Sequence, residues 1–211
     1  MENAFDLLKA HYPELEPMMP DIRAAYEVIK TAYENGGKLM ICGNGGSAAD
    51  ALHMVGELMK GFKLKRAMDA SARSRFISAG VSEDVCDKLQ GGLPAISLMG
   101  ELSLVSAFCN DVDPTLIYAQ QIYALGKPGD VLLGISTSGN AENIAAAIIV
   151  AKAMKIRTIG LTGRKRGRFR DLCDISIRVP ADETYRVQEY HLPVYHAVCA
   201  ELEQYFFGKT Q

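Results

Sequence analysis

The sequence predicts an α/β fold in which helices cover both faces of one five-stranded parallel sheet. Two observations predict it. Short apolar runs end in glycine or polar residues, as strands buried on both faces of a sheet do. Helical patterns lie between these runs, and such alternation favours βαβ units. No linker divides the chain, so residues 1–211 are expected to form a single domain.

Residues 1–37 are expected to be helical. Between Ile22 and Tyr33, apolar residues recur at i, i+3, i+4 and i+7, which is typical of an amphipathic helix. Gly36-Gly37 would end this helix. A shorter helix is expected before it, and three prolines separate the two: Pro13, Pro17 and Pro20.

Five strands and five further helices are predicted from the change of period along the chain. The strands are expected at residues 38–43, 95–99, 130–136, 157–162 and 175–179. The helices are expected at residues 47–60, 102–108, 119–125, 141–154 and 187–207.

Residues 61–94 interrupt this alternation. The segment has few periodic apolar positions and ends in Gly91-Gly92-Leu93-Pro94. It is rich in cations, so it is either a solvated surface excursion or a mobile basic lid over an anionic ligand. The cations are Lys63, Lys65, Arg66, Arg73, Arg75 and Lys88.

Composition excludes several classes of protein. With 48% hydrophobic and 23% charged residues, the chain is neither disordered nor collagenous. A net charge of −2 does not favour general nucleic-acid binding, and no apolar run is long enough to span a membrane. Five scattered cysteines without a C-x-x-C pair indicate a reducing compartment. We therefore expect a cytoplasmic protein.

Two loops have the character of a phosphate site. Asn44-Gly45-Gly46-Ser47 follows the first predicted strand, and Ser136-Thr137-Ser138-Gly139-Asn140 follows the third. Each opens into a helix, where free backbone N–H groups and the helix dipole favour an anion. The alternative is that these residues only make turns and helix caps. A dinucleotide site is disfavoured because residues 62–75 are basic and lack the expected acidic strand end.

Histidines and a glutamate form a second candidate cluster. His53 and Glu57 are four residues apart and share one helix face. The C-terminal helix carries Gln188, Glu189, His191 and His196. A solvated polar face is the alternative for the first pair, unless another element docks over it.

At this point the chain resembles a known family. Five segments carry the resemblance: residues 42–58 (CGNGGSAADALHMVGEL), Asn110-Asp111, 129–140 (GDVLLGISTSGN), 159–163 (IGLTG) and 187–196 (VQEYHLPVYH). They are similar to the SIS-domain phosphoheptose isomerases. The resemblance covers nearly the whole chain. It implies a single SIS domain with a flavodoxin-like αβα sandwich, in a homotetramer whose sites neighbouring subunits complete.

The resemblance also implies a metal site and roles for its residues. Positions matching His53, Glu57, Gln188 and His196 bind a divalent metal, usually zinc, and Glu57 and His196 are acid/base candidates. Asp111 is a candidate for hydrogen bonds to sugar hydroxyls, or else an ordinary loop cap.

Two departures concern the sugar. Gly61 stands where the family often has arginine, so Lys60, Lys65 or Arg66 is expected to replace that guanidinium, and Ala141 stands at a family serine.

The resulting expectation is an aldose–ketose isomerase. It would convert sedoheptulose 7-phosphate to D-glycero-D-manno-heptose 7-phosphate through a cis-enediol, with zinc as cofactor. The alternatives are a non-catalytic phosphosugar-binding or protein-binding SIS module, and an isomerase of another ketose phosphate. Neither a nucleic acid nor a membrane is an expected partner.

Overall fold

The computed structural model describes residues 3–165 and 167–208. Its centre is a five-stranded parallel sheet with the order β2-β1-β3-β4-β5. The strands are β1 (Leu39–Gly43), β2 (Ala95–Ser97), β3 (Val131–Ser136), β4 (Arg157–Thr162) and β5 (Ile175–Arg178). Every residue of β1 and β3 is buried, which explains their continuous apolar runs. The predicted fold class is confirmed.

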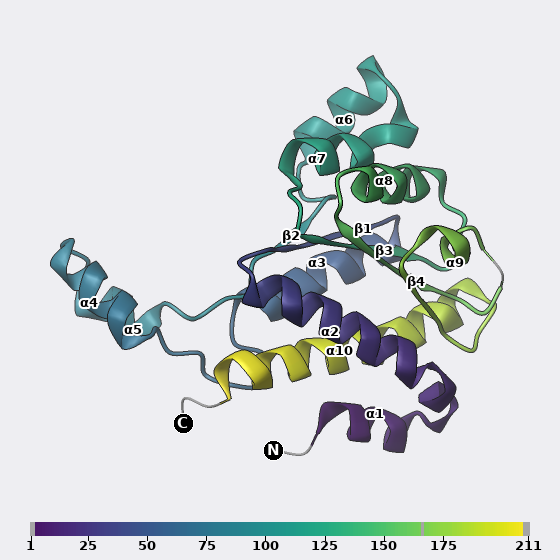
Figure 1. Cartoon of the computed structure of the whole chain (residues 1–211). Coiled ribbons are helices and arrows are strands. Elements are labelled where there is room, and N and C mark those ends of the chain that lie inside the picture. The colour runs from purple at the N-terminus through teal and green to yellow at the C-terminus, as the bar shows by residue number, and fades with distance from the viewer. Residues whose placement is uncertain (1–2, 166, 209–211) are drawn as a thin grey trace.

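Helices cover both faces of the sheet (Figure 1). One face packs on α2 (Met19–Glu34), α3 (Gly46–Met59) and α10 (Thr184–Phe207). The other face packs on α7 (Ile117–Leu125), α8 (Glu142–Ala153) and α9 (Phe169–Leu172). Alternate residues of one strand serve the two cores: Leu39 and Ile41 face the first, and Met40 and Cys42 face the second.

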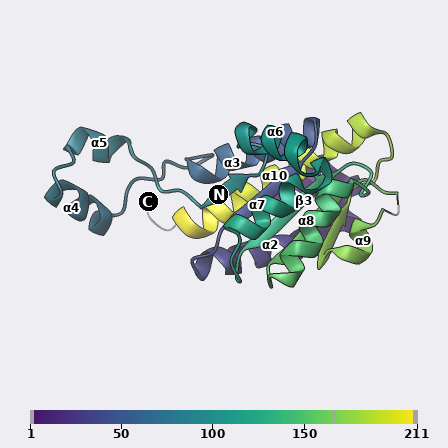
Figure 2. The same ribbon diagram turned by 90° about the horizontal axis from the view of Figure 1, so that it is seen from above.

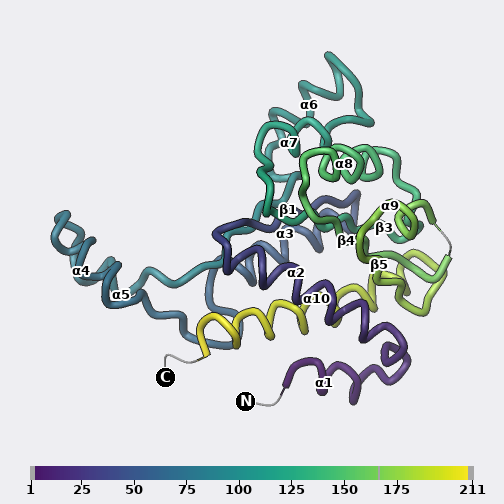
Figure 3. The backbone as a smooth tube through the Cα atoms, viewed as in Figure 1, coloured from purple at the N-terminus to yellow at the C-terminus, as the bar shows by residue number. Residues whose placement is uncertain are grey.

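The N-terminal segment adds a further layer to the α10 side. Helix α1 (Ala4–His11) and the 3₁₀ helix η1 (Pro13–Met18) precede α2, so the expected pair of helices is present. Figure 3 shows α1 alongside α10. Asn3 begins α1 because its side chain accepts hydrogen bonds from the backbone N–H groups of Phe5 and Asp6. Phe5 and Leu8 are buried against the rest of the protein.

Residues 61–94 form an arm that projects from the body of the protein (Figure 2). It holds α4 (Ala70–Ser78) and α5 (Glu83–Lys88), and an antiparallel bridge between Ala67 and Gln90 closes its base. The arm leaves the body of the protein at the C-terminal end of α3, whereas the predicted phosphate loops lie at the N-terminal end of α3. It therefore lies away from the loops of its own chain.

The charge of the arm differs from the basic surface that its composition indicates. Arg66 is buried in an ion pair with Glu203. Arg73 pairs with Glu83 and Asp87, and Lys88 pairs with Asp84. Half of the arm's cations are thus neutralised by nearby carboxylates.

Two connecting elements complete the chain. Helix α6 (Leu102–Asp111) and the 3₁₀ helix η2 (Pro114–Leu116) link β2 to α7 at the edge of the sheet. Every helix in the described part of the chain is too short or too polar to cross a bilayer.

Candidate active site

A pocket of about 410 Å³ opens where β1 and β3 end. The first strand leads into it through a left-handed residue, Gly45, with φ +55°. A Cβ atom on Gly46 would lie 2.3 Å from Nε2 of Gln188, so a side chain there would displace the Gln188 amide. The N-terminus of α3 therefore lies directly against the side-chain amide of Gln188 on α10. Lining residues are Asn44, Gly45, Gly46, Ser47, Ile135, Ser136, Thr137, Ser138, Ala141, Thr184 and Gln188.

The loop after β3 is shaped by its own hydroxyl groups. Ser136 Oγ accepts from Gly139 N at 3.2 Å, and Ser138 Oγ accepts from Asn140 N at 3.2 Å. Each hydroxyl keeps its proton for an acceptor in the pocket, such as a phosphate oxygen. Asn140 faces the other way, because its Oδ1 accepts from Arg168 N at 3.0 Å. The structure thus brings both predicted phosphate loops into one pocket, with Asn140 as a support for its wall.

Asn143 and Tyr118 contact the lining residue Asn44, and the sequence analysis did not single them out. Asn44 and Asn143 exchange two amide hydrogen bonds of 3.0 Å, which tie the first loop to α8. The Tyr118 hydroxyl lies 3.2 Å from Asn44 Oδ1 and also donates to Gly43 O. The one sequence signal for Asn143 was its place three residues after Asn140, at the start of a helix.

Asn110 and Asp111 lie elsewhere. They end α6, are exposed, and share a hydrogen bond of 2.8 Å from Asn110 Nδ2 to Asp111 Oδ1. Among the described residues that line the pocket at the ends of β1 and β3, none belongs to α6 or to the arm. Within one chain, these two side chains are therefore not part of the pocket.

A second cluster lies farther along α3 and α10, which run side by side in the same direction. His53 Nε2 is 3.3 Å from Glu57 Oε1, and the rings of His53 and His196 are 5.0 Å apart between centroids. Glu57 Oε2 and His196 Nε2 are buried and have no hydrogen-bond partner among the described residues. Burial and the neighbouring His53 lower the pKa of His196, and the Glu57 carboxylate opposes this change. His196 is therefore a neutral imidazole at pH 7.

The donors of this cluster fit a divalent metal in their chemistry. Imidazole nitrogens and a carboxylate are ligands that zinc accepts, and Glu57 Oε2 and His196 Nε2 are buried atoms without a hydrogen-bond partner among the described residues. Gln188 lies apart from them, against Gly46 in the pocket at the ends of β1 and β3. Their present arrangement is open, since no three His, Cys, Asp or Glu side chains in residues 3–165 and 167–208 surround a single point as metal ligands would.

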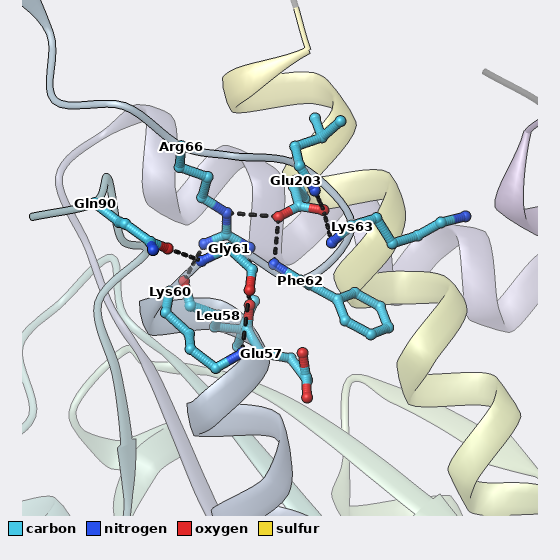
Figure 4. A network of polar contacts seen from close by, with 10 residues as sticks. Glu57, Leu58, Lys60, Gly61, Phe62, Lys63, Arg66, Gln90 and Glu203 are labelled. Carbon is cyan, nitrogen blue, oxygen red and sulfur yellow. Dashed lines mark hydrogen bonds and ion pairs between the residues drawn. The ribbon is translucent and has the colours of Figure 1, made fainter. Parts of the chain in front are cut away.

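A buried ion pair supports the end of α3 below this cluster (Figure 4). Arg66 Nε donates to Glu203 Oε1 at 2.7 Å, and its other nitrogens donate to Leu58 O at 2.6 Å and Glu57 O at 2.8 Å. Glu203 also accepts from the backbone N–H groups of residues 62–64. The network holds the last turn of α3, which carries Glu57, to α10 and the arm.

This network corrects one expectation about the arginine absent at Gly61. The Arg66 side chain is 0% exposed and fully engaged, so it is not available to a ligand. A Cβ atom on Gly61 would lie 2.4 Å from Leu64 O, so the local backbone excludes any side chain there. Lys60 Nζ donates to Gly61 O at 3.1 Å, and Lys65 is exposed on the arm.

His191 is a core residue. It is fully buried on α10, and neither ring nitrogen has a side-chain partner among the described residues. Burial lowers its pKa to about 4 from an ordinary value of 6.5. Of the two histidines expected close together on this helix, only His196 belongs to the candidate site.

We expect His191 to make the protein acid-sensitive. Its folded pKa lies below its unfolded pKa, so the unfolded state binds more protons between pH 6.5 and about 4. Its contribution to stability is complete above pH 6.5 and falls by about 3 kcal/mol as the pH drops to 4. Urea unfolding measures the free energy of unfolding at pH 7 and at pH 4. The decrease between these two pH values should be smaller in His191→Leu than in the parent by about 3 kcal/mol. An equal loss in parent and variant would contradict the prediction.

Comparisons with known proteins agree with this geometry. A SIS domain family model matches residues 5–75 and 78–163. Phosphoheptose isomerase of Geotalea daltonii is 41% identical over 196 residues, 93% of this chain and 90% of that protein. The Helicobacter pylori phosphoheptose isomerase is 36% identical over the same shares of both chains.

Solved structures give the same result. A phosphoheptose isomerase from Francisella tularensis superposes with a TM-score of 0.76 at 31% identity, covering 93% of this chain and 92% of that one. A phosphoheptose isomerase from Neisseria gonorrhoeae has a TM-score of 0.69 at 31% identity, covering 93% and 98%.

Proposed function

This chain belongs to the SIS-domain phosphoheptose isomerases, and we propose that it interconverts sedoheptulose 7-phosphate and D-glycero-D-manno-heptose 7-phosphate. It is an isomerase, and its relatives indicate a phosphorylated heptose as substrate. The observation that carries the proposal is the placement of the phosphate pocket and the His53–Glu57–His196 cluster along the same two helices.

The separation of the two sites supports a long substrate. His53 follows Gly46 by seven residues, which is about 10 Å of helical rise. An extended seven-carbon chain spans a comparable distance. A phosphate at the N-terminus of α3 would therefore place the other end of the sugar near His53 and Glu57.

The phosphate pocket would bind and orient the sugar. Backbone N–H groups of residues 45–47 and the hydroxyls of Ser136, Thr137 and Ser138 supply donors for the phosphate oxygens. Binding the phosphate fixes the open-chain sugar relative to Glu57, so that proton transfer becomes intramolecular.

Glu57 and His196 would move the protons of the reaction. The Glu57 carboxylate takes the proton from C1 of the ketose, which gives a cis-enediol, and returns it to C2. Neutral His196 passes a proton between O1 and O2, so that the carbonyl moves from C2 to C1. Its lowered pKa keeps it able to accept this proton at neutral pH.

We further propose a divalent metal, with zinc as the first candidate, held by His53, Glu57 and His196. Gln188 is the fourth ligand that the family resemblance implies. When bound, the metal would polarise the carbonyl and hydroxyl oxygens of the sugar.

A cytoplasmic homotetramer is the assembly we propose. Leu102, Val112 and Tyr123, at and near α6 and α7, are 64% to 71% exposed, which supports a surface that packs against another subunit. Neighbouring subunits would then complete each site.

The deciding experiment is an isomerase assay with added Zn²⁺ and a panel of ketose phosphates. Turnover of sedoheptulose 7-phosphate above all others supports the proposal. Preference for a different ketose phosphate would favour the alternative that the protein isomerises that sugar phosphate. Phosphosugar binding without turnover of any member would favour a binding module.

The hydroxyls of Ser136 and Ser138 should contribute strongly to phosphate binding. A hydrogen bond to a charged group contributes about 1.5–3 kcal/mol, so Ser138→Ala should weaken phosphosugar binding by at least about 10-fold. The double change of Ser136 and Ser138 to alanine should weaken it further. Isothermal titration with sedoheptulose 7-phosphate measures both. The control is Ser106→Ala, since Ser106 is an exposed serine of α6. Parental affinity in the double variant would remove this loop from the phosphate site.

A further inference from the structure

The hydroxyl of Tyr195 lies between His53 and Asp50. Tyr195 precedes His196 on α10 and is 1% exposed. Its oxygen is 2.9 Å from His53 Nδ1 and 3.3 Å from Asp50 Oδ1. Asp50 and His53 are three residues apart on α3, so one hydroxyl from the neighbouring helix reaches both.

An ionised Asp50 assigns a direction to these hydrogen bonds, although burial raises the pKa of this carboxyl. An ionised carboxylate only accepts, so the single proton of the Tyr195 hydroxyl goes to Asp50. The tyrosine oxygen then accepts from Nδ1–H of His53. A neutral imidazole protonated at Nδ1 carries its lone pair on Nε2.

The free nitrogen faces the candidate metal site. His53 Nε2 is 3.3 Å from Glu57 Oε1, so in the Nδ1–H tautomer a lone pair and a carboxylate oxygen oppose each other. A cation between them would relieve this repulsion. Metal-bound histidines commonly donate their other ring N–H to a fixed acceptor, which sets the tautomer and the ring orientation.

We infer that Tyr195 and Asp50 are positioning residues that hold His53 in the Nδ1–H tautomer, with Nε2 ready to bind a metal. The inference rests on the proposed role of His53 as a metal ligand. Tyr195 and Asp50 touch neither substrate nor metal, and they act through His53.

Two substitutions in the full-length chain test the hydrogen bonds from His53 to Tyr195 and from Tyr195 to Asp50. Tyr195→Phe keeps the buried ring and removes the hydroxyl. Asp50→Ala keeps the hydroxyl but frees its proton to turn toward Nδ1, which would move the histidine proton to Nε2. Loss of such an outer partner typically costs 10–100-fold in metal affinity. We therefore expect both variants to bind Zn²⁺ about 10–100-fold more weakly in competition with a chelator.

The control is Tyr190→Phe. Tyr190 lies on the same helix as Tyr195, but its hydroxyl donates to Glu14 at 2.8 Å, away from His53. The zinc affinity of the Tyr190→Phe variant should therefore equal that of the parent. Thermal unfolding of each variant confirms that the fold is retained. Nitrogen-15 spectra of the metal-free protein, with the His53 signals assigned through His53→Ala, should show Nδ1–H in the parent and a shift toward Nε2–H in Asp50→Ala.

Four outcomes separate this inference from the proposed function. Parental zinc affinity in both Tyr195→Phe and Asp50→Ala would overturn the positioning role, as would an Nε2–H tautomer in the parent. Undiminished zinc in His53→Ala would instead refute His53 as a ligand, even if the parent shows the Nδ1–H tautomer. Weaker zinc binding in both variants, with the control unchanged, supports the inference.

Discussion

Glu57→Gln should lower turnover of sedoheptulose 7-phosphate by roughly 10²–10⁴-fold, the usual contribution of a general base. Glutamine keeps the size of the side chain and one carbonyl oxygen, but it cannot take a proton near neutral pH. Affinity for the sugar phosphate should change little, because Glu57 is not among the residues that line the phosphate pocket. Steady-state kinetics and titration calorimetry measure the two effects.

Metal content decides how the Glu57 result is read. It must be measured in the same preparation, since loss of the carboxylate charge can also release a metal. Glu189→Gln is the matched control, because Glu189 lies on the exposed face of α10 in an ion pair with Arg186. A Glu57→Gln protein that keeps its metal, binds substrate and exchanges the C1 proton with solvent at the parental rate would exclude Glu57 as base. His196 would then be the candidate.

The sheet and the meeting of the two loops in one pocket could be predicted from the sequence because their signals are local. Strands buried on both faces leave continuous apolar runs, and a helix that opens on glycine and serine leaves a short recognisable loop. Parallel strands end at one edge of a sheet, so two such loops must meet there. Gly45 and Ser138 therefore came together as expected.

The parts that could not be predicted depend on contacts between distant segments. Tyr195 lies on a mostly apolar helix, and only the docking of α10 on α3 brings its hydroxyl to His53, 142 residues away. Arg66 looked like a free cation in a basic segment, but its partner Glu203 is 137 residues away. For Asn110 and Asp111, a contact with the pocket was predicted but is not found within one chain. Their motif does not tell where the helix that carries it will lie.

The same limitation applies to the arm. Its cations are visible in the sequence, but their partners and the direction of the segment depend on how its base is attached. That base is fixed by Glu203 through the backbone of residues 62–64, a contact without any local pattern.

Glu203→Ala should reduce the free energy of unfolding by about 3–5 kcal/mol, the usual effect of removing one partner of a buried ion pair. Both side chains are at most 1% exposed, so the guanidinium of Arg66 would remain charged and buried without its carboxylate. Backbone N–H groups of residues 62–64 would also lose their acceptor. Urea unfolding at pH 7 gives the change in free energy directly.

Asp87→Ala is the matched control, because it removes an Arg–carboxylate pair from the same arm in an exposed setting. Asp87 is 64% exposed in its pair with Arg73, and pairs of this kind contribute about 0–1 kcal/mol. If Glu203→Ala is no more destabilising than Asp87→Ala, the buried network does not stabilise the fold as described. Arg66 also holds the carbonyls of Glu57 and Leu58. Amide hydrogen exchange should therefore increase at the end of α3 in Glu203→Ala but not in Asp87→Ala, which would link the buried pair to the position of the proposed base.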